Sequence, residues 1–543
     1  MRRPRRAGEP DGVTNDNTPS RRTVLRGAAL TAATIPIAGA APPAAGSSLS
    51  RKRTPVTVGP GDPRYDSLVF RGYNRRFECR PDQIRVVGST QDVILAVDEA
   101  VRSGRRIAVR SGGHCFENLV DDPAVRMLVD MSTMTDVRYD RRRNAFMVEA
   151  GATLGEVYQR LFLEWGVTIP GGTSADVGMG GHICGGGYGA LCRVHGLTVD
   201  HLYAVEVVVV GRDGRAASVV ATREASDPNH DLWWAHTGSG GGNFGIITRY
   251  WFRSPGGDPA EPLPRPPSTV LDFSLDWSWD ELDRDTFVRL LRNYGEWTER
   301  NSAAGSPAAA LYGEFTLTSR PTETITLSGQ VATDKGARPL LDDLLKALGR
   351  GVAARPARQI STLPWLLAAT KGFGGGPGPF HRVKMKSGFR RRRFTDKQMA
   401  VAHHHLTRTD YGHPYGHLFI NTYGGRVSTV SPSATAMAHR DSTFLAGFLV
   451  GWDDPSEDAR HLGWIREFYR DIYAGGGGVP AGADDEGAFI NYPDTDMADP
   501  EQNTSATPWH ALYYGDGYSR LRQVKRRWDP HDIFRHALSI SSG

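Results

Sequence analysis

The chain has 543 residues, of which 39% are hydrophobic and 23% are charged, and its formal net charge is +5 at pH 7. This length suits two or three domains with their own cores, and the composition is that of a soluble globular protein. The charge is too small and too dispersed to predict a nucleic-acid partner. The dense basic run 390–393 is predicted to be a solvated loop, with a rim that attracts an acidic substrate as the alternative.

The N-terminal residues predict an export signal. Ser20-Arg-Arg-Thr-Val-Leu25 precedes an apolar, alanine-rich stretch over 27–41, and small residues follow it. This order of charged, apolar and cleavage regions predicts a twin-arginine signal over 1–45, followed by a leader over 46–64. The apolar part is too short for a stable membrane anchor. We therefore expect the twin-arginine machinery to export a folded, secreted or extracytoplasmic protein; a disordered basic tail is the alternative.

Residues 65–255 alternate helical and strand-like patterns. A helix is predicted over 92–101, and strands are predicted over 107–110, 127–130, 145–149 and 204–210. The proline-rich stretch 256–267 breaks all periodicity and is predicted to be a linker.

Residues 268–480 are predicted to form a second domain with an antiparallel sheet covered by helices. Its expected strands span 269–273, 309–317, 324–328, 418–423 and 444–448, and its expected helices span 285–299 and 339–348. The tail, 481–543, contains a predicted helix near 518–528.

The four cysteines form no CxxC pair and match no zinc spacing, so we predict no metal site. A different pattern, Arg110-Ser-Gly-Gly-His-Cys115, follows the strand predicted over 107–110. Its two glycines let the backbone turn tightly and approach a ligand, and successive N–H groups at such a turn can bind a phosphate. A neutral His114 beside them can act as a nucleophile. The alternative is a surface turn with a chance histidine.

Three further runs follow in order: Val177–Gly189, Gly238–Gly245 and Ile490-Asn-Tyr-Pro-Asp494. Together the four runs resemble the berberine-bridge-enzyme-like flavoproteins over about 65–540, and especially the secreted actinobacterial oxidases of sugars or glycosides, such as the aclacinomycin oxidoreductases. The resemblance implies an α+β fold. It comprises a two-part FAD-binding domain of the PCMH, or vanillyl-alcohol-oxidase, type over 65–255, a substrate domain over 268–480, and a C-terminal segment over 481–543 that returns to the FAD domain.

The resemblance also implies FAD as the cofactor, bonded covalently to His114. The other residues that it places at FAD are Arg110, Ser111, Gly112, Gly113, Cys115, Ser174, Val177, Gly178, Gly181, His182, Gly186, Asn243, Gly245, Ile247, Asn491 and Tyr492. Ser174 stands where many relatives have a second linking cysteine, and a hydroxyl is a far poorer nucleophile than a thiolate. We therefore predict one link, with Cys184 as the alternative site of a second.

The catalytic residues predicted from the resemblance are Tyr492, Tyr188, Asn421 and Tyr423. Tyr492 is the expected base; since a free phenol has a pKa near 10, it needs help, and Tyr188 is the candidate helper. A packed aromatic is the alternative for Tyr492. Asn421 and Tyr423 share one face of a predicted strand. Relatives have Tyr, Glu or Asp at the position of Asn421, and an amide cannot take a proton, so we expect no second base there.

The sequence thus predicts an exported FAD-dependent oxidase that oxidises a hydroxyl carbon of a sugar or glycoside by hydride transfer to flavin N5. Val177 occupies the position that gates oxygen in relatives, which favours O₂ as acceptor and H₂O₂ as product. Trp365, Phe373 and Tyr423 are expected to stack against the substrate ring. The alternatives are a tailoring oxidase of a secondary metabolite such as a glycosylated polyketide, a dehydrogenase with another acceptor, and a flavin-bearing protein without turnover.

Overall fold

Two sheets build the half of the chain that contains the glycine-rich runs. The computed structural model describes residues 56–258, 260–372 and 381–543, so the predicted signal, the leader up to residue 55 and Phe373 lie outside the described residues. The first sheet has four strands in the order β1 (Val56–Val58), β2 (Gln83–Val86), β4 (Met127–Asp130) and β3 (Ile107–Arg110). The second has five, in the order β5 (Val137–Asp140), β6 (Ala145–Glu149), β9 (Ile246–Phe252), β7 (Leu202–Val210) and β8 (Ala216–Thr222).

Strands β2, β4 and β3 run parallel, whereas the five-stranded sheet is antiparallel. Because β3 ends at Arg110, the first glycine loop leaves the carboxyl edge of a parallel sheet, which is where α/β folds commonly bind ligands. The helices of this half are α1 (Tyr65–Val69), α2 (Thr90–Ser103), α3 (Leu154–Trp165), α4 (Met179–Cys184), α5 (Cys192–His195) and α6 (His230–Ala235).

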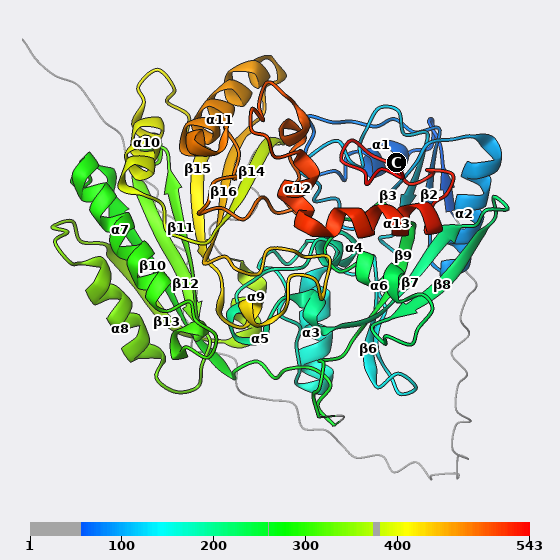
Figure 1. The fold of residues 1–543 in the computed structure, drawn as a ribbon, viewed down its shortest axis with the longest axis horizontal. Coiled ribbons are helices and arrows are strands. Elements are labelled where there is room, and N and C mark those ends of the chain that lie inside the picture. Colours follow the sequence, from blue (N-terminus) through cyan, green and yellow to red (C-terminus); the bar gives the residue numbers. More distant parts are fainter. Residues whose placement is uncertain (1–55, 259, 373–380) are drawn as a thin grey trace, which may run out of the picture. The chain divides into compact units, whose positions relative to one another are not determined.

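The second half is built on a seven-stranded antiparallel sheet. Its strands follow the order β13 (Ala357–Pro364), β10 (Thr269–Ser278), β12 (Thr324–Val331), β11 (Leu311–Thr318), β15 (Gly416–Thr422), β16 (Phe444–Trp452) and β14 (Arg382–Arg390). Helices cover one face, on the left of Figure 1: α7 (Arg284–Arg300), α8 (Ala337–Leu348), α10 (Asp396–Thr407) and α11 (Asp458–Ile472). A shorter helix, α9 (Trp365–Lys371), packs against α3.

Side-chain alternation in the central strands separates this helix-covered face from a cavity-facing one. On β11, Leu311, Phe315 and Leu317 are fully buried, whereas the alternate residues Tyr312 and Glu314 line a cavity. On β15 the cavity-facing set is His417, Phe419 and Asn421. Because successive side chains of a strand point to opposite faces, this sheet presents a regular row of side chains to the cavity.

The C-terminal residues lie against the half that carries the glycine runs. Helix α12 (Trp509–Tyr514) leads to α13 (Tyr518–Trp528), which contacts α6 and is drawn in red in Figure 1. The buried Lys525 ammonium donates to the carbonyl of Asn243 at 2.9 Å, and the amide of Ile540 donates to the Asn243 side chain at 3.0 Å. A single cluster of buried apolar residues runs through both halves.

The structure corrects three local predictions. The strand expected over 309–317 begins only at Leu311, because residues 307–310 form a 3₁₀ turn that starts with a proline. The strand expected over 418–423 ends one residue earlier, at Thr422. Arg390, expected in a solvated loop, ends β14 and is buried in an ion pair with Asp485. None of the helices in the described ranges is long and apolar enough to cross a lipid bilayer.

Buried histidines predict a loss of stability in mild acid. His236 and His439 are each 2% exposed, and a ring N–H of each donates to a backbone carbonyl. Burial lowers the pKa of each from 6.5 to about 4. The unfolded chain therefore binds more protons between pH 6.5 and 4, so stability is full above pH 6.5 and falls with pH by at most roughly 3 kcal/mol per histidine. Urea midpoints measured from pH 7.5 to 5 should fall steeply.

This pH effect is tested by replacing one buried histidine and, as a control, one exposed histidine. His439→Gln should make the pH dependence shallower, because His236 and other buried histidines remain, whereas His404→Gln, on the exposed face of α10, should leave it unchanged. A wild-type midpoint that does not vary over this pH range would contradict the argument.

Candidate active site

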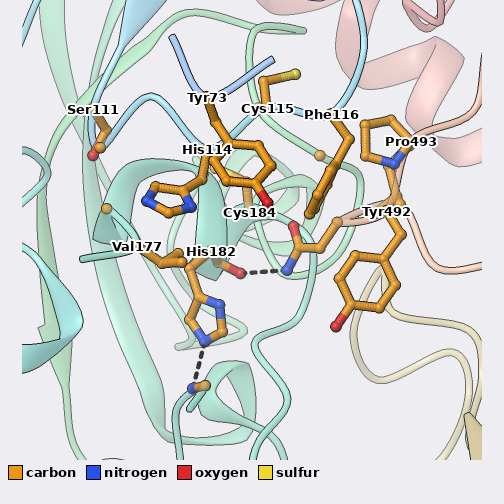
Figure 2. A pocket seen from close by; sticks show the side chains of 18 of the residues that line it. Tyr73, Ser111, His114, Cys115, Phe116, Val177, His182, Cys184, Tyr492 and Pro493 are labelled. Atoms are coloured by element: carbon orange, nitrogen blue, oxygen red, sulfur yellow. Dashed lines mark hydrogen bonds between the residues drawn. The ribbon is translucent and has the colours of Figure 1, made fainter. Parts of the chain in front are cut away.

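A cavity of about 620 Å³ lies between the glycine-rich loops and the free face of the seven-stranded sheet. Its lining includes His114 and Val177 from the loops, Glu314 and Asn421 from the sheet, and Tyr492 from the C-terminal segment. Figure 2 shows His114 and Tyr492 directed into the same space from different segments. The third glycine run also lines the cavity, so the structure brings together all four sequence motifs and the substrate-side sheet.

Glycine is required where two of the loops meet. A Cβ on Gly112 would overlap the backbone nitrogen of Gly178, and a Cβ on Gly178 would overlap that of Gly112. Gly113 has a φ of +84°, and its Cβ would collide with the carbonyl of Arg71. Any other residue would push the loops apart.

The first loop presents donors to the cavity. Among the described residues, the amides of Gly112, Gly113 and His114 donate to no acceptor, so they are available to an anionic group. The Arg110 side chain turns away, into an ion pair with Asp121. A floor of glycine backbone with free amides fits the pyrophosphate of FAD.

His114 is held from two sides. Its Nε2 lies 3.1 Å from Asp176 Oδ2, and its ring stacks on Tyr73 at 5.3 Å between centroids. The hydrogen bond to His114 lowers the pKa of the Asp176 carboxyl. Since Asp176 occupies Nε2, the other ring nitrogen, Nδ1, is left for a partner in the cavity.

The second loop fixes the segment that carries Tyr492. The Asn491 amide donates to the carbonyl of His182 at 2.9 Å, and the His182 ring accepts from the amide of Gly172 at 3.1 Å. Burial lowers the pKa of His182 to about 4, so the ring is neutral and can accept. The backbone of Gly185 lies against Asn491, where a Cβ would overlap the amide oxygen.

Tyr492 has an apolar cage and a free hydroxyl. The rings of Phe116, Phe419 and Phe489 meet it edge-on at 5.8, 6.1 and 5.2 Å. Its hydroxyl has no hydrogen-bond partner among the described residues and is directed into the cavity (Figure 2). Burial raises the pKa of Tyr492, and the charge of Glu314 raises it further.

The hydroxyls of two predicted catalytic residues donate to backbone carbonyls. Tyr188 lines the cavity, but its hydroxyl donates to the carbonyl of Thr422. The Tyr188 proton is therefore not available for a hydrogen bond to Tyr492. Tyr423 is fully buried outside the lining, and its hydroxyl donates to the carbonyl of His439 at 3.0 Å. Asn421 does line the cavity.

The cavity lining includes every predicted cofactor residue except Gly186 and Asn243. Asn243 instead joins the third glycine run to the C-terminal segment, and Gly186 packs beside Met437. Trp365, expected to stack on the substrate, is buried between Tyr158 and Phe162. The aromatic side chains that do line the cavity are Tyr73, Phe116, Tyr188, Tyr312, Tyr415, Phe419, Phe489, Tyr492 and Phe534.

Burial disfavours the thiolate form of the two cysteines that line the cavity, Cys115 and Cys184. All four cysteines are free. Burial raises the pKa of the Cys184 thiol to about 11 and that of Cys115 to about 12. Cys184 contacts the carbonyl of Gly180 at 3.1 Å. Because the thiolate is the nucleophile, this burial disfavours a second flavin link through Cys184.

A buried ion cluster behind the cavity was not predicted. Lys384 Nζ lies 2.7 Å from Asp494 and also pairs with Glu117; Lys386 Nζ lies 2.6 Å from Asp494 and 2.9 Å from Asp496. Glu117 follows His114 by three positions and Asp494 follows Tyr492 by two. The cluster therefore joins both motifs to β14. The alternation Lys-Met-Lys in a strand indicates that both lysines lie on one face. The acidic partners of these lysines are distant in sequence, so the cluster itself could not be predicted.

Glu314 was also missed. It faces the cavity from β11, and burial raises its pKa to about 7, although side-chain hydrogen bonds from Tyr312, Asn421 and Thr316 act in the opposite direction. The alternation of apolar and polar residues over 311–318 could have identified the strand face. No group of three or more potential metal ligands occurs among the described residues.

The contact between Gly185 and Asn491 predicts a mutational effect. Gly185→Ala should leave the fold intact but displace Asn491 and Tyr492, and a displacement of about 1 Å can lower the chemical rate by roughly 10²-fold. Gly463→Ala, on the exposed face of α11 with no atom within 4 Å of the added Cβ, is the control and should not slow the enzyme. Anaerobic flavin reduction followed by stopped-flow absorbance compares the two. Equal rates would show that this contact does not position Tyr492.

Comparisons with known proteins agree with this site. The family model described as FAD binding domain matches residues 81–219, and that described as Berberine and berberine like matches residues 488–541. The aclacinomycin-N/aclacinomycin-A oxidase of Streptomyces galilaeus is 49% identical over 525 residues, covering 95% of this chain and 94% of that protein. The hexose oxidase of Chondrus crispus is 33% identical over 534 residues, covering 88% of this chain and 93% of that protein.

The solved structures agree as well. The crystal structure of a glycopeptide hexose oxidase complexed with teicoplanin has a TM-score of 0.86 and 49% identity, covering 90% of this chain and 99% of that chain. The predicted α+β fold class and the predicted family are confirmed by these matches. The chain belongs to the berberine-bridge-enzyme-like family and is an FAD-dependent oxidoreductase with a PCMH-type FAD-binding domain.

Proposed function

We propose that this protein oxidises a hydroxyl-bearing carbon of a sugar or glycoside. The observation that carries the proposal is the free hydroxyl of Tyr492 in the cavity that also contains His114. An alcohol oxidation needs a proton acceptor and a hydride acceptor at one carbon, held in a fixed geometry. FAD, when bound, supplies the hydride acceptor at flavin N5 and passes the electrons to O₂, giving H₂O₂.

The residues of the first loop hold the cofactor in this proposal. His114 forms one covalent bond to FAD, supported by the orientation that Asp176 and Tyr73 impose on its ring. Ser174 lines the cavity but cannot replace a thiolate, and the burial of Cys184 disfavours a second bond. The free amides of residues 112–114 receive the pyrophosphate.

Tyr492 handles the proton of the substrate hydroxyl. Three phenylalanine rings contact its ring edge-on, and the hydroxyl is its polar end. Asn421 orients a neighbouring hydroxyl of the substrate by hydrogen bonding, since its buried Oδ1 has no partner among the described residues. Val177 lines the cavity with a small side chain, which supports O₂ as the acceptor.

The relatives favour a glycosylated natural product as the substrate. The Streptomyces relative is named as an oxidase of aclacinomycins, and a solved relative contains the glycopeptide teicoplanin. Aromatic side chains surround the cavity, and Tyr415 is exposed. Such a lining suits a sugar ring attached to a larger apolar group. A free hexose is the second candidate, supported by the relative named hexose oxidase.

We further propose that the twin-arginine signal over 1–45 exports the folded protein. A cofactor inserted in the cytoplasm would require a route for folded proteins. A fusion of residues 1–55 to a reporter should be exported, and a fusion with Arg21 and Arg22 changed to lysine should stay inside the cell.

The activity is tested by flavin bleaching. D-glucose, maltose and aclacinomycin N are mixed anaerobically with the FAD-loaded protein, and the oxidised flavin absorbance is followed. Bleaching by one of them, followed by recovery and H₂O₂ release on admission of air, is the expected result. Bleaching without recovery in air would favour a dehydrogenase with another acceptor. No bleaching by any of the three would overturn the proposed substrate class.

A further inference from the structure

Glu314 occupies the wall of the cavity opposite the glycine loops. It lies on β11 directly across from Asn421 on β15, since the two residues are paired in the sheet register. Tyr492 lines the same cavity, and the charge of Glu314 raises the pKa of Tyr492. The two groups therefore face the same cavity from different elements, β11 and the C-terminal segment.

The surroundings of Glu314 leave its carboxyl group unsaturated. Tyr312 donates to Oε2 at 3.3 Å and Thr316 to Oε1 at 3.5 Å, both at the long end of hydrogen bonding, and the side chain of Asn421 is the third partner. No cation among the described residues contributes to its pKa. A carboxylate can accept about four hydrogen bonds, so capacity remains for a ligand. Burying a carboxyl group without a neighbouring cation costs folding free energy. Carboxyl groups in such surroundings are typical of functional sites.

Among the described titratable groups on this side of the cavity, Glu314 is the one whose charge changes near neutral pH. The titratable side chains that feel its charge are Tyr312 on its own strand, Tyr294 on α7, and Tyr492; His417 lines the same cavity farther along β15, opposite Thr318. Burial raises the pKa of all three tyrosines and lowers that of His417 to about 4. The pKa of Glu314 itself is raised to about 7.

The raised pKa of Tyr492 creates a need for such a group. A neutral phenol can accept the substrate proton only if it releases its own proton at the same time. Sequence reasoning placed no base on this wall, because Asn421 cannot accept a proton. The neighbouring strand supplies the missing carboxylate.

We propose that Glu314 is the proton acceptor to which Tyr492 passes the proton of the substrate hydroxyl, an inference that rests on the proposed alcohol oxidation. The hydroxyl O–H bond breaks as Tyr492 gains that proton, and the original Tyr492 proton reaches the Glu314 carboxylate. The carbon loses a hydride to the bound FAD, so one proton and one hydride leave the substrate. Asn421 positions Glu314 by donating from its amide.

Three variants test the proposal: Glu314→Gln removes the acceptor, Glu314→Asp keeps it, and Glu296→Gln is a charge-matched control on α7, where Glu296 is half-buried beside Arg393 and outside the cavity lining. Anaerobic flavin reduction by D-glucose and by aclacinomycin N is measured from pH 5 to 9. In the wild type and in Glu296→Gln, the rate should rise with pH about a midpoint near 7. Glu314→Gln should be roughly 10²-fold slower at pH 8 and independent of pH. Glu314→Asp should retain a pH-dependent rate.

A second readout does not depend on turnover. Because the folded pKa of Glu314 exceeds the ordinary value of 4.5, its contribution to stability falls as pH rises through 7. Glu314→Gln should therefore be more thermostable than the wild type at pH 8 and show no such difference at pH 5. This result also establishes that the variant is folded.

The outcomes distinguish failure of the proton-acceptor role of Glu314 from failure of the proposed alcohol oxidation. A slow Glu314→Gln variant that retains the wild-type pH profile would show that Glu314 only shapes the cavity, and would overturn the proton-acceptor role. A variant as fast as the wild type would do the same. If neither probe bleaches the wild-type flavin, the proposed alcohol oxidation fails, and this inference fails with it.

Discussion

His114→Ala is expected to abolish covalent attachment of FAD. The wild-type protein, denatured and measured by intact mass, should carry one FAD, and the variant should carry none. The physical reason is that His114 presents a ring nitrogen to the cavity while Asp176 holds the other at 3.1 Å and Tyr73 stacks on the ring. We expect this all-or-none change without unfolding, because the His114 side chain is partly exposed and not part of the core.

The control variants for this measurement are Cys184→Ala and Ser174→Ala, which should both keep the attached FAD. If His114→Ala retained FAD in a form resistant to denaturation, a second attachment would exist, and its loss in a His114→Ala/Cys184→Ala double variant would locate it. A well-folded wild type that gained no mass would rule out covalent attachment. Noncovalent FAD would then be the form to measure.

Tyr492→Phe is expected to slow flavin reduction by 10²- to 10⁴-fold, the usual contribution of a positioned acid–base group. The substitution keeps the ring, and therefore the edge-on contacts with Phe116, Phe419 and Phe489, while it removes the hydroxyl directed into the cavity. The folded protein and its bound FAD should be unchanged. Stopped-flow reduction by the substrate that bleaches the wild type is the measurement.

Tyr423→Phe is the matched comparison, because its hydroxyl lies outside the cavity and donates to the carbonyl of His439. It should cost about 1 kcal/mol of stability for the lost hydrogen bond and leave the reduction rate within a few-fold of the wild type. A Tyr492→Phe variant with the wild-type rate would move the proton chemistry to another group. An effect of Tyr423→Phe as large as that of Tyr492→Phe would show that the hydroxyls report on packing instead.

Local sequence determined the elements and the loop chemistry. The apolar spacing over 92–101 lies within α2, whose ends are set by the Ser89 cap and by Gly104 in a left-handed conformation. The run Arg110–His114 placed its two glycines where any Cβ would collide with a neighbouring loop. Such features depend on neighbours in sequence and on backbone geometry, so they can be predicted from the chain alone.

Tertiary structure decided which side chains share the cavity. Tyr423 was expected beside Asn421, but its ring packs against Tyr188 and Phe389, which bury it outside the cavity lining. Glu314 could not be assigned to the site from its sequence position, because only the pairing of β11 with β15 places it across from Asn421. The buried Lys384 likewise meets Glu117 and Asp494 from distant segments.

The physical reason is the range of the interactions involved. Helix caps, glycine turns and strand alternation are set within a few residues, and the sequence by itself determined them here, together with the motifs that indicate FAD. The electrostatic environment of Tyr492 and Glu314 arises from burial and from charges brought together by the seven-stranded sheet and the C-terminal segment. Those quantities exist only in the folded chain, and therefore only the tertiary structure could place Glu314 in the same cavity as Tyr492.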